Sequence, residues 1–145
     1  MHVLAACVWV GGTVVLVFIA VPYARTLSGD ARAQALVALG RGWRMFGWGA
    51  MAVAAATGVQ LAAADGAFDD ASSRFDTVLV VKLVAVALLI VGALLHDFVL
   101  GPRLAQQIRG GEEQTFRRPL VLVGWTNFAL TLTVPVLGVV LGHLS

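Results

Sequence analysis

The chain has 145 residues, of which 59% are hydrophobic and only 12% are charged. Soluble domains carry about 25% charged residues, so this composition excludes an ordinary soluble domain and indicates a membrane protein. The length allows a single membrane domain, residues 1–145. One cysteine excludes an intramolecular disulfide. The net charge of +2 comes from short segments between apolar runs, so it does not indicate a nucleic-acid partner.

Four apolar runs follow one another along the chain, at Val3 to Pro22, Met45 to Ala64, Thr77 to Leu100 and Pro119 to His143. Each run can cross a hydrocarbon layer of about 30 Å at about 1.5 Å rise per residue. Lipid forces such segments to satisfy their backbone groups as helices. The sequence therefore predicts an all-α membrane protein, a bundle of four spans. No basic stretch precedes the first run, so we expect a span there and not a cleaved signal peptide.

The charges between the runs predict the orientation. Arginine dominates before the second and fourth runs, at Arg25, Arg32, Arg41, Arg44, Arg103, Arg109, Arg117 and Arg118. The segment before the third run is acidic, with Asp65, Asp69, Asp70 and Asp76. The positive-inside rule places both arginine segments in the cytoplasm, with the acidic segment and both termini outside, in the inner (cytoplasmic) membrane of the cell.

Two segments between the runs carry local predictions. Residues 31–39 show apolar positions at helical spacing, which fits either an amphipathic helix lying on the inner surface or a loop with a short helix. Residues 66–73 are rich in Gly, Asp and Ser, which predicts a turn-rich outer loop.

The two halves of the chain share spaced features. Pro22 closes the first run as Pro102 closes the third, and His2 precedes Pro22 by the same interval as Lys82 precedes Pro102. This spacing predicts two similar helical hairpins related by a pseudo-twofold axis along the membrane normal, with His2 and Lys82 at matching depth.

His2, Lys82 and His143 belong to three different runs, yet the predicted topology brings all three to the outer side. Neutral imidazole binds copper, zinc and haem iron, and a lysine can bind a metal once it has lost its proton. The alternative for each is structural: Lys82 reaches the headgroups, His143 caps a helix end, and His2 is a terminal residue in water.

Two softer ligands lie close to His2 in the sequence. Met1 and Cys7 could join a soft copper site, or Cys7 could be a small buried apolar residue. Small residues on the spans, such as Gly11, Gly12 and Gly58, favour close helix packing and could also admit a flat macrocycle.

A second polar group lies near the inner end of the third run. Asp97, next to His96, can pair with Arg103 or with Arg44 of the neighbouring span, which is the structural interpretation of this inner polar cluster. A role in proton movement or as a second ligand site is the functional alternative.

One ordered set of short motifs resembles a known family. It comprises His2-x6-Trp9-x-Gly11-Gly12, Arg44 to Trp48, Thr57-Gly58, Lys82-Leu83, and His96-Asp97-Phe98 followed by Leu100 to Arg103. Together these resemble the copper-resistance D family, the CopD-like membrane proteins. The resemblance implies copper uptake or tolerance, with copper bound at the outer face by His2 and His143 together with Met1 or Cys7.

A histidine that opens the first span and a lysine early in the third also resemble the HemJ-type protoporphyrinogen oxidases. That resemblance is more distant, since the Gly11-Gly12 stretch and the tract ending at Arg25 depart from it. It implies haem b held by His2 and Lys82, with His143 as a further candidate ligand, in electron transfer or porphyrin oxidation.

The sequence leaves three functions open: a copper-binding or transport protein, a haem-binding oxidoreductase, and an accessory subunit without a cofactor. The first two differ in cofactor, copper or haem. Besides the lipid bilayer, a homo-oligomer or a larger membrane complex would supply the partners, because no ladder of Met, Cys or His crosses the midplane of one chain.

Overall fold

The computed structural model describes residues 1–64, 74–110 and 117–144. The helices are α1 (His2–Val15), η1 (Leu16–Ala20), α2 (Val21–Thr26), α3 (Gly29–Ala64), α4 (Arg74–Leu94), η2 (Leu95–Leu100), α5 (Gly101–Gly110) and α6 (Arg117–Leu141). They form four continuous rods, each long and apolar enough to cross a membrane. The predicted all-α bundle of four spans is confirmed, while the outer loop predicted at residues 66–73 lies outside the described residues.

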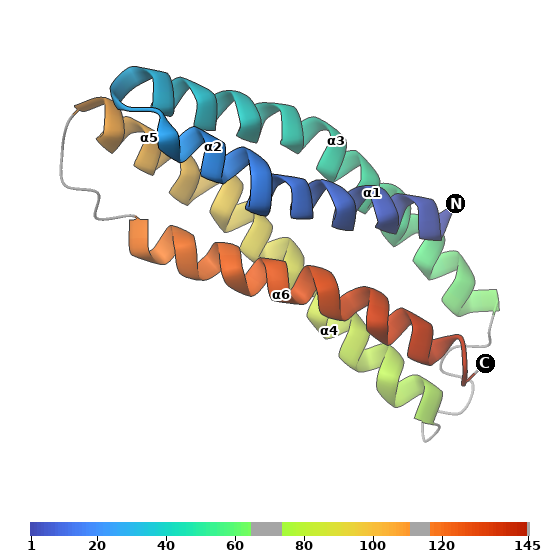
Figure 1. Cartoon of the computed structure of the whole chain (residues 1–145). Helices are drawn as coiled ribbons and strands as arrows, with labels where there is room; N and C mark the ends of the chain where they lie inside the picture. The colour runs from blue at the N-terminus through green and yellow to red at the C-terminus, as the bar shows by residue number, and fades with distance from the viewer. Residues whose placement is uncertain (65–73, 111–116, 145) are drawn as a thin grey trace.

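The four rods form two hairpins (Figure 1). The first places α1 beside α3, and the second places α4 beside α6. The hairpins meet where α1 packs on α6 and where α3 packs on α5. Both ends of the chain lie at the same end of the bundle, here called the termini end. The opposite end, which carries α2, the start of α3, α5 and the start of α6, is here called the arginine end.

Residues 31–39 belong to α3, which runs without a break for 36 residues from Gly29 to Ala64. The expectations of a surface helix or of a loop with a short helix are both corrected by this finding. The physical reason is burial: Ala33 of α3 and Ala24 of α2 have no exposed surface, so packing between helices, not lipid, holds this segment. A helix of this length measures about 54 Å, which exceeds the hydrocarbon core by about 24 Å.

The chain reverses between α2 and α3 within a few residues. Leu27 is extended, with φ −84° and ψ 158°, and ends α2. Gly29 follows with a φ of 52°, in the left-handed region where a Cβ is disfavoured. Glycine at this position therefore permits the tight turn that lays α3 back along α1.

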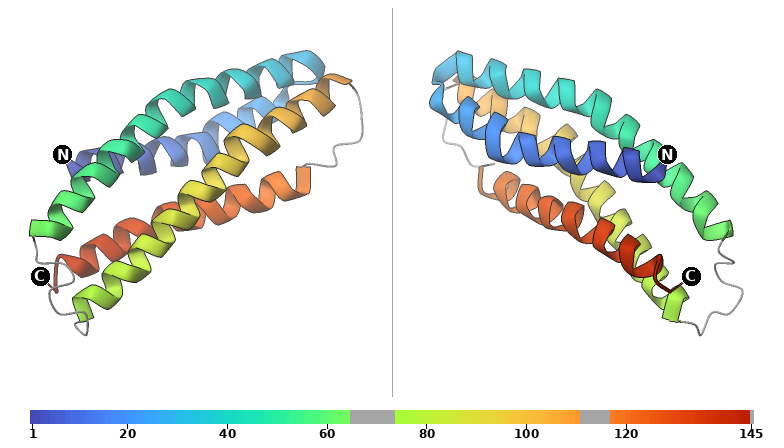
Figure 2. Two further views of the ribbon diagram at one scale, coloured as in Figure 1. Left: turned by 180° about the vertical axis from the view of Figure 1, so that it is seen from behind. Right: turned by 45° about the vertical axis from the view of Figure 1, so that its right-hand side comes forward.

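The first and third rods, which run side by side with their hairpin partners in Figure 2, share the same irregularity. In the first rod the Val21 N–H donates to the Leu16 carbonyl, five residues back, and in the third rod the Gly101 N–H donates to the His96 carbonyl. These π-helical turns η1 and η2 lie directly before Pro22 and Pro102. Proline has no N–H and its ring clashes with the carbonyl four residues back, a conflict that a wider turn relieves. The matching turns support the predicted repeat.

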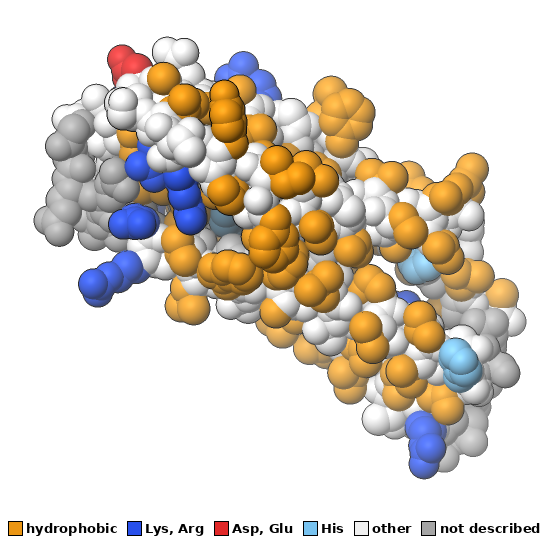
Figure 3. Space-filling model, in the orientation of Figure 1, with side chains coloured by type: hydrophobic (Ala, Val, Ile, Leu, Met, Phe, Trp, Pro, Cys, Tyr) orange, Lys and Arg blue, Asp and Glu red, His pale blue; other side chains and the backbone are white. Residues whose placement is uncertain are grey.

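Aromatic side chains join the first hairpin internally and to the second. The Trp9 indole N–H donates to Thr131 Oγ1 of α6 at 3.3 Å, and Thr131 is only 2% exposed. The Trp9 ring also contacts Trp43 of α3, with 5.6 Å between centroids. The surface between the two ends is largely hydrophobic (Figure 3), as expected where lipid covers the helices.

Candidate functional site

His2 lies between α1 and α3 near the termini end. Its Nδ1 is 2.8 Å from the Ala54 carbonyl oxygen and 3.1 Å from Thr57 Oγ1. A carbonyl oxygen only accepts, so in this geometry Nδ1 carries the proton and donates it. A neutral ring then has its lone pair on Nε2. This is the arrangement in which histidine ligands are fixed for metal binding, with one ring nitrogen held by the protein and the other free to bind.

Gly58 makes room for the His2 ring. A Cβ at this glycine would lie 3.1 Å from His2 Cε1 and 3.5 Å from Nδ1, closer than most carbon contacts. Any larger residue at position 58 would therefore press on the imidazole. The sequence motif Thr57-Gly58 thus supplies both a hydrogen-bond acceptor and space for the same ring.

Lys82 occupies the corresponding place in the second hairpin. It lies on α4 with its side chain against Gly138 of α6, where a Cβ would be 3.2 Å from Nζ. The interval from His2 to Lys82 along the chain is the same as the interval from Gly58 to Gly138. Each hairpin therefore holds a nitrogen side chain against a glycine of its second helix, at equivalent positions of the repeat.

His143 lies just beyond the last residue of α6, at the same end of the bundle. Its Nδ1 donates to the carbonyl of Val139 on its own helix at 2.8 Å, which again leaves Nε2 for a ligand. Met1 is 86% exposed and Cys7 is also exposed. Cys7 is turned about 140° around α1 from His2, away from the face that carries the imidazole, because successive residues of an α-helix are about 100° apart.

The predicted outer residues share one end of the bundle without forming a cluster. Within residues 1–64, 74–110 and 117–144, no three His, Cys, Asp or Glu side chains come together as a group able to hold a metal ion.

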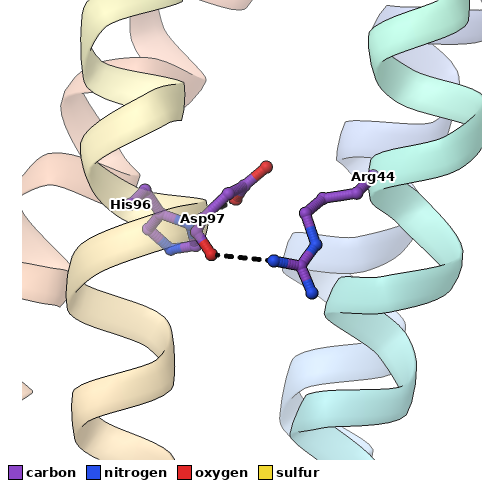
Figure 4. A network of polar contacts seen from close by, with 3 residues as sticks. All are labelled: Arg44, His96 and Asp97. Atoms are coloured by element: carbon purple, nitrogen blue, oxygen red, sulfur yellow. Dashed lines mark hydrogen bonds and ion pairs between the residues drawn. The ribbon is translucent and has the colours of Figure 1, made fainter.

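The inner polar cluster lies on η2 and α3 (Figure 4). His96 Nδ1 donates to Asp97 Oδ1 at 2.9 Å, so the imidazole is bonded to a carboxylate. Arg44 donates from Nη1 to the backbone carbonyl of Asp97 at 3.3 Å, and its guanidinium lies over the Phe98 ring, 5.3 Å from the centroid. On the far side, a Cβ at Gly124 of α6 would lie 3.7 Å from His96 Nε2.

These contacts refine the predicted pairing of Asp97. Arg44 does approach this residue, as expected from the neighbouring span, but it reaches the main chain while the carboxylate accepts from His96. The π-helical turn and Pro102 together explain the choice: the Gly101 N–H bonds to the His96 carbonyl, and Pro102 has no N–H, so neither residue donates to the Asp97 carbonyl, which is left for Arg44. Arg103 lies in the first turn of α5, next to Pro102.

Sequence reasoning missed the partners of these side chains. Ala54 contributes to the site through its backbone carbonyl, which accepts a hydrogen bond from His2, and the identity of its side chain gives no sign of this role. Gly138 and Gly124 were hidden among many small residues of an apolar helix. The equal spacing of His2 with Lys82 and of Gly58 with Gly138 was the signal that could have found the first of them.

Comparison with known proteins gives one match. Neither a curated protein nor a solved structure matches the chain. A family model described as a domain of unknown function (DUF4149) matches residues 4–113, which includes Lys82 and the inner polar cluster and leaves His2 and His143 outside. Because that match extends over three of the four rods and most of the sequence, the chain belongs to the DUF4149 family.

Proposed function

We propose that the chain is a membrane protein that binds haem b near its termini end and takes part in electron transfer or porphyrin oxidation. The observation that carries the proposal is the paired placement of His2 against Gly58 and Lys82 against Gly138. Two nitrogen side chains at equivalent depths, one from each hairpin, are suited to one ligand held between the hairpins.

The donor set suits haem. Haem supplies four nitrogen ligands of its own and would need only one or two further ligands from the protein. His2 offers Nε2, since Nδ1 is engaged by the Ala54 carbonyl and Thr57. Lys82, once deprotonated, offers Nζ as the second. When bound, haem would supply one-electron chemistry.

The chain's own residues would orient and shield this site. The Ala54 carbonyl and the Thr57 hydroxyl fix the plane of the His2 ring, because both lie within hydrogen-bond distance of Nδ1. The Thr57 hydroxyl in turn donates to the Val53 carbonyl at 2.6 Å, so its oxygen is turned to accept from the imidazole. Apolar side chains of the spans would keep water from the ring.

A visible spectrum tests the proposal. Full-length protein purified in mild detergent, from cells supplied with a haem precursor, should show a Soret band. His2→Ala should reduce haem content about tenfold or more, because loss of even a metal ligand's hydrogen-bond partner typically costs about 10- to 100-fold in affinity. His143→Ala is the comparison at the same end: because the proposal makes Lys82 and not His143 the second ligand, this variant should leave the band unchanged.

Two outcomes would contradict the haem proposal. One is wild-type protein without a Soret band under these conditions. The other is a band of equal height in the wild type and in His2→Ala. Lys82→Ala adds a third measurement: a shift of the band position with retained haem identifies Lys82 as the second ligand.

A copper site at the same end is the second candidate. It is favoured by the shared state of His2 and His143, in which Nδ1 donates to a backbone carbonyl and Nε2 is left for a metal. Neutral imidazole is a good copper ligand. Metal analysis separates the two candidates: a copper site loses copper in both His2→Ala and His143→Ala, whereas a haem site is insensitive to the second substitution.

A further inference from the structure

The second hairpin places two polar side chains in one contact between its helices. A Cβ at Gly92 of α4 would meet the Asn127 side chain of α6, and a Cβ at Gly124 of α6 would lie 3.7 Å from His96 Nε2. Gly92 and His96 are one turn apart on their rod, as Gly124 and Asn127 are on α6. Residues at this interval share a helix face. The Asn127 amide and the His96 ring therefore lie about one turn apart in the same contact, here called the inner seam.

The His96 ring has one nitrogen engaged and one open. Nδ1 donates to the Asp97 carboxylate at 2.9 Å (Figure 4), so the lone pair of a neutral ring is on Nε2. A Cβ at Gly124 would be almost as close to Cδ2, at 3.8 Å, as to Nε2. Gly124 thus lies beside the ring and not in line with the Nε2 lone pair, which is left free to accept.

Neither Nε2 of His96 nor the Asn127 amide has a hydrogen-bond partner within the described residues. The buried side-chain nitrogens and oxygens without a partner in that part of the chain are Arg32 Nε and Trp48 Nε1. His96 Nε2 and the Asn127 amide are not among these buried atoms, so both have surface that a water molecule can reach. An amide left unpaired at membrane depth costs free energy that a bound water would recover.

The inner seam begins near the membrane boundary. At about 1.5 Å per residue, α3 from Arg44 to its last residue, Ala64, is about 30 Å long, the thickness of a hydrocarbon core. With Ala64 at one boundary, Arg44 lies at the other, together with Asp97, whose carbonyl accepts from Arg44. Gly92, five residues before Asp97, is only about 8 Å inside the core. Water from the headgroup region therefore has a short path to Asn127.

The spacing in the inner seam suits one bridging water. One helical turn is about 5.4 Å, close to twice a hydrogen-bond length of about 2.8 Å. A water between the two side chains donates one hydrogen to His96 Nε2 and bonds to the Asn127 amide. Carboxylate, imidazole and water then follow one another in the order that allows an imidazole to accept a proton.

The charges around His96 support its role as the proton acceptor. Asp97 lies beside it, Arg44 of α3 bonds the main chain of Asp97 and not its carboxylate, and Arg103 lies two turns further along on α5. Helix α6 meets the ring with Gly124, which has no side chain. The Asp97 carboxylate is therefore available to stabilise an imidazolium.

We propose that His96 and Asn127 hold a water molecule in the inner seam, and that His96 with Asp97 is a proton-exchange site open to the arginine end. A proton that arrives from that end passes through the water to Nε2, forms an imidazolium paired with Asp97, and leaves by the same route. This site is separate from the proposed haem site and does not depend on it.

Solid-state NMR of the full chain in lipid bilayers tests the proposal. Asn127 is the only asparagine and His96 one of three histidines, so isotope-labelled asparagine and histidine report on few sites. Glutamine substitutions of the other two histidines identify the His96 signals. Magnetisation from water should reach the Asn127 side-chain amide faster than the Trp9 indole N–H, which already has a partner on α6. At about pH 8, where free histidine is neutral, Nδ1 of His96 should carry the proton, and acidification should add one at Nε2.

Variants separate a water held by His96 from general hydration. His96→Phe keeps a ring and removes Nε2, so water transfer to Asn127 should be lost. His143→Phe, the same change at the other end, and Thr126→Val, which removes an exposed hydroxyl beside Asn127, should leave the transfer unchanged. Transfer that persists in His96→Phe overturns the proposal. If that variant fails to fold, the wild type alone decides: absent water transfer to Asn127, or a proton on Nε2 at about pH 8, overturns it as well.

Discussion

At the scale of single residues, several glycines of this protein leave space for large or polar side chains of neighbouring helices. A Cβ at each of several glycines would meet a side chain from a neighbouring helix. The pairs are Gly58 with His2, Gly138 with Lys82, Gly124 with His96, Gly92 with Asn127, and Gly12 with Trp43. Small residues in spans usually allow backbones to approach. Here they also make space for the side chains that distinguish this bundle from a purely apolar one.

Two adjacent glycines provide a test of this role. Gly12→Ala would drive a methyl group into the Trp43 ring, whereas a Cβ at Gly11 meets nothing within 4 Å. We expect Gly12→Ala to lower stability by about 1–3 kcal/mol, as overpacking does. Gly11→Ala should leave stability equal or slightly raised, because alanine favours helix. Thermal unfolding in detergent measures both, and equal melting temperatures would contradict the packing described for Trp43.

The sequence could identify the polar residues of the candidate site but not what they contact. His2, Lys82 and Asp97 stand out because ionisable residues in apolar runs are rare. Their partners are backbone carbonyls and glycines, which have no chemical signature in a sequence. The hydrogen bond from Arg44 to the Asp97 carbonyl depends on the π-helical turn η2, and the hydropathy of the sequence does not predict such a turn.

At the scale of elements, the helices extend beyond the apolar runs of the sequence. Hydropathy marks where a chain enters lipid, and it predicted the four spans because lipid imposes helix on each of them. It could not predict where each helix ends outside the lipid. At the arginine end, α3 continues from Met45 back to Gly29 because burial of Ala33 against its neighbours replaces burial in lipid.

Proline substitution tests the continuity of α3. Ala38 lies on the exposed side of the part of α3 that precedes Met45, and Ala38→Pro should cost about 3 kcal/mol by removing a helical hydrogen bond. Ser28→Pro is the matched control. Leu27 before it is already extended, the conformation that proline prefers in its predecessor. Thermal unfolding and circular dichroism report the difference, and equal stability of both variants would indicate a loop at residues 31–39.

At the scale of the whole molecule, the two ends of the bundle differ in the charged side chains that they carry. Most of the arginine and lysine side chains visible in Figure 3 gather at the arginine end, whereas histidine side chains appear toward the termini end. The positive-inside rule then predicts that the arginine end faces the cytoplasm and both chain termini face outward.

Cysteine labelling tests this orientation. In a Cys7→Ala background, Leu144→Cys places a thiol at the termini end and Gln106→Cys places one on the exposed face of α5. A membrane-impermeant maleimide should label Leu144→Cys in intact cells and Gln106→Cys only after permeabilisation. The reverse pattern would show that the charge rule assigns the wrong orientation.

Among the described residues, those without any exposed surface lie at the arginine end. Ala24 and Ala33, which have no exposed surface, lie at the arginine end, where Leu104 and Ala105 of α5 are also buried. Toward the termini end, α3 and α4 diverge (Figures 1 and 2). The two hairpins are thus packed together at the arginine end and through Trp9 and Thr131, and they separate toward the termini end. His2 belongs to the first hairpin and Lys82 to the second, so the haem proposed above would connect the two hairpins at the end where α3 and α4 diverge.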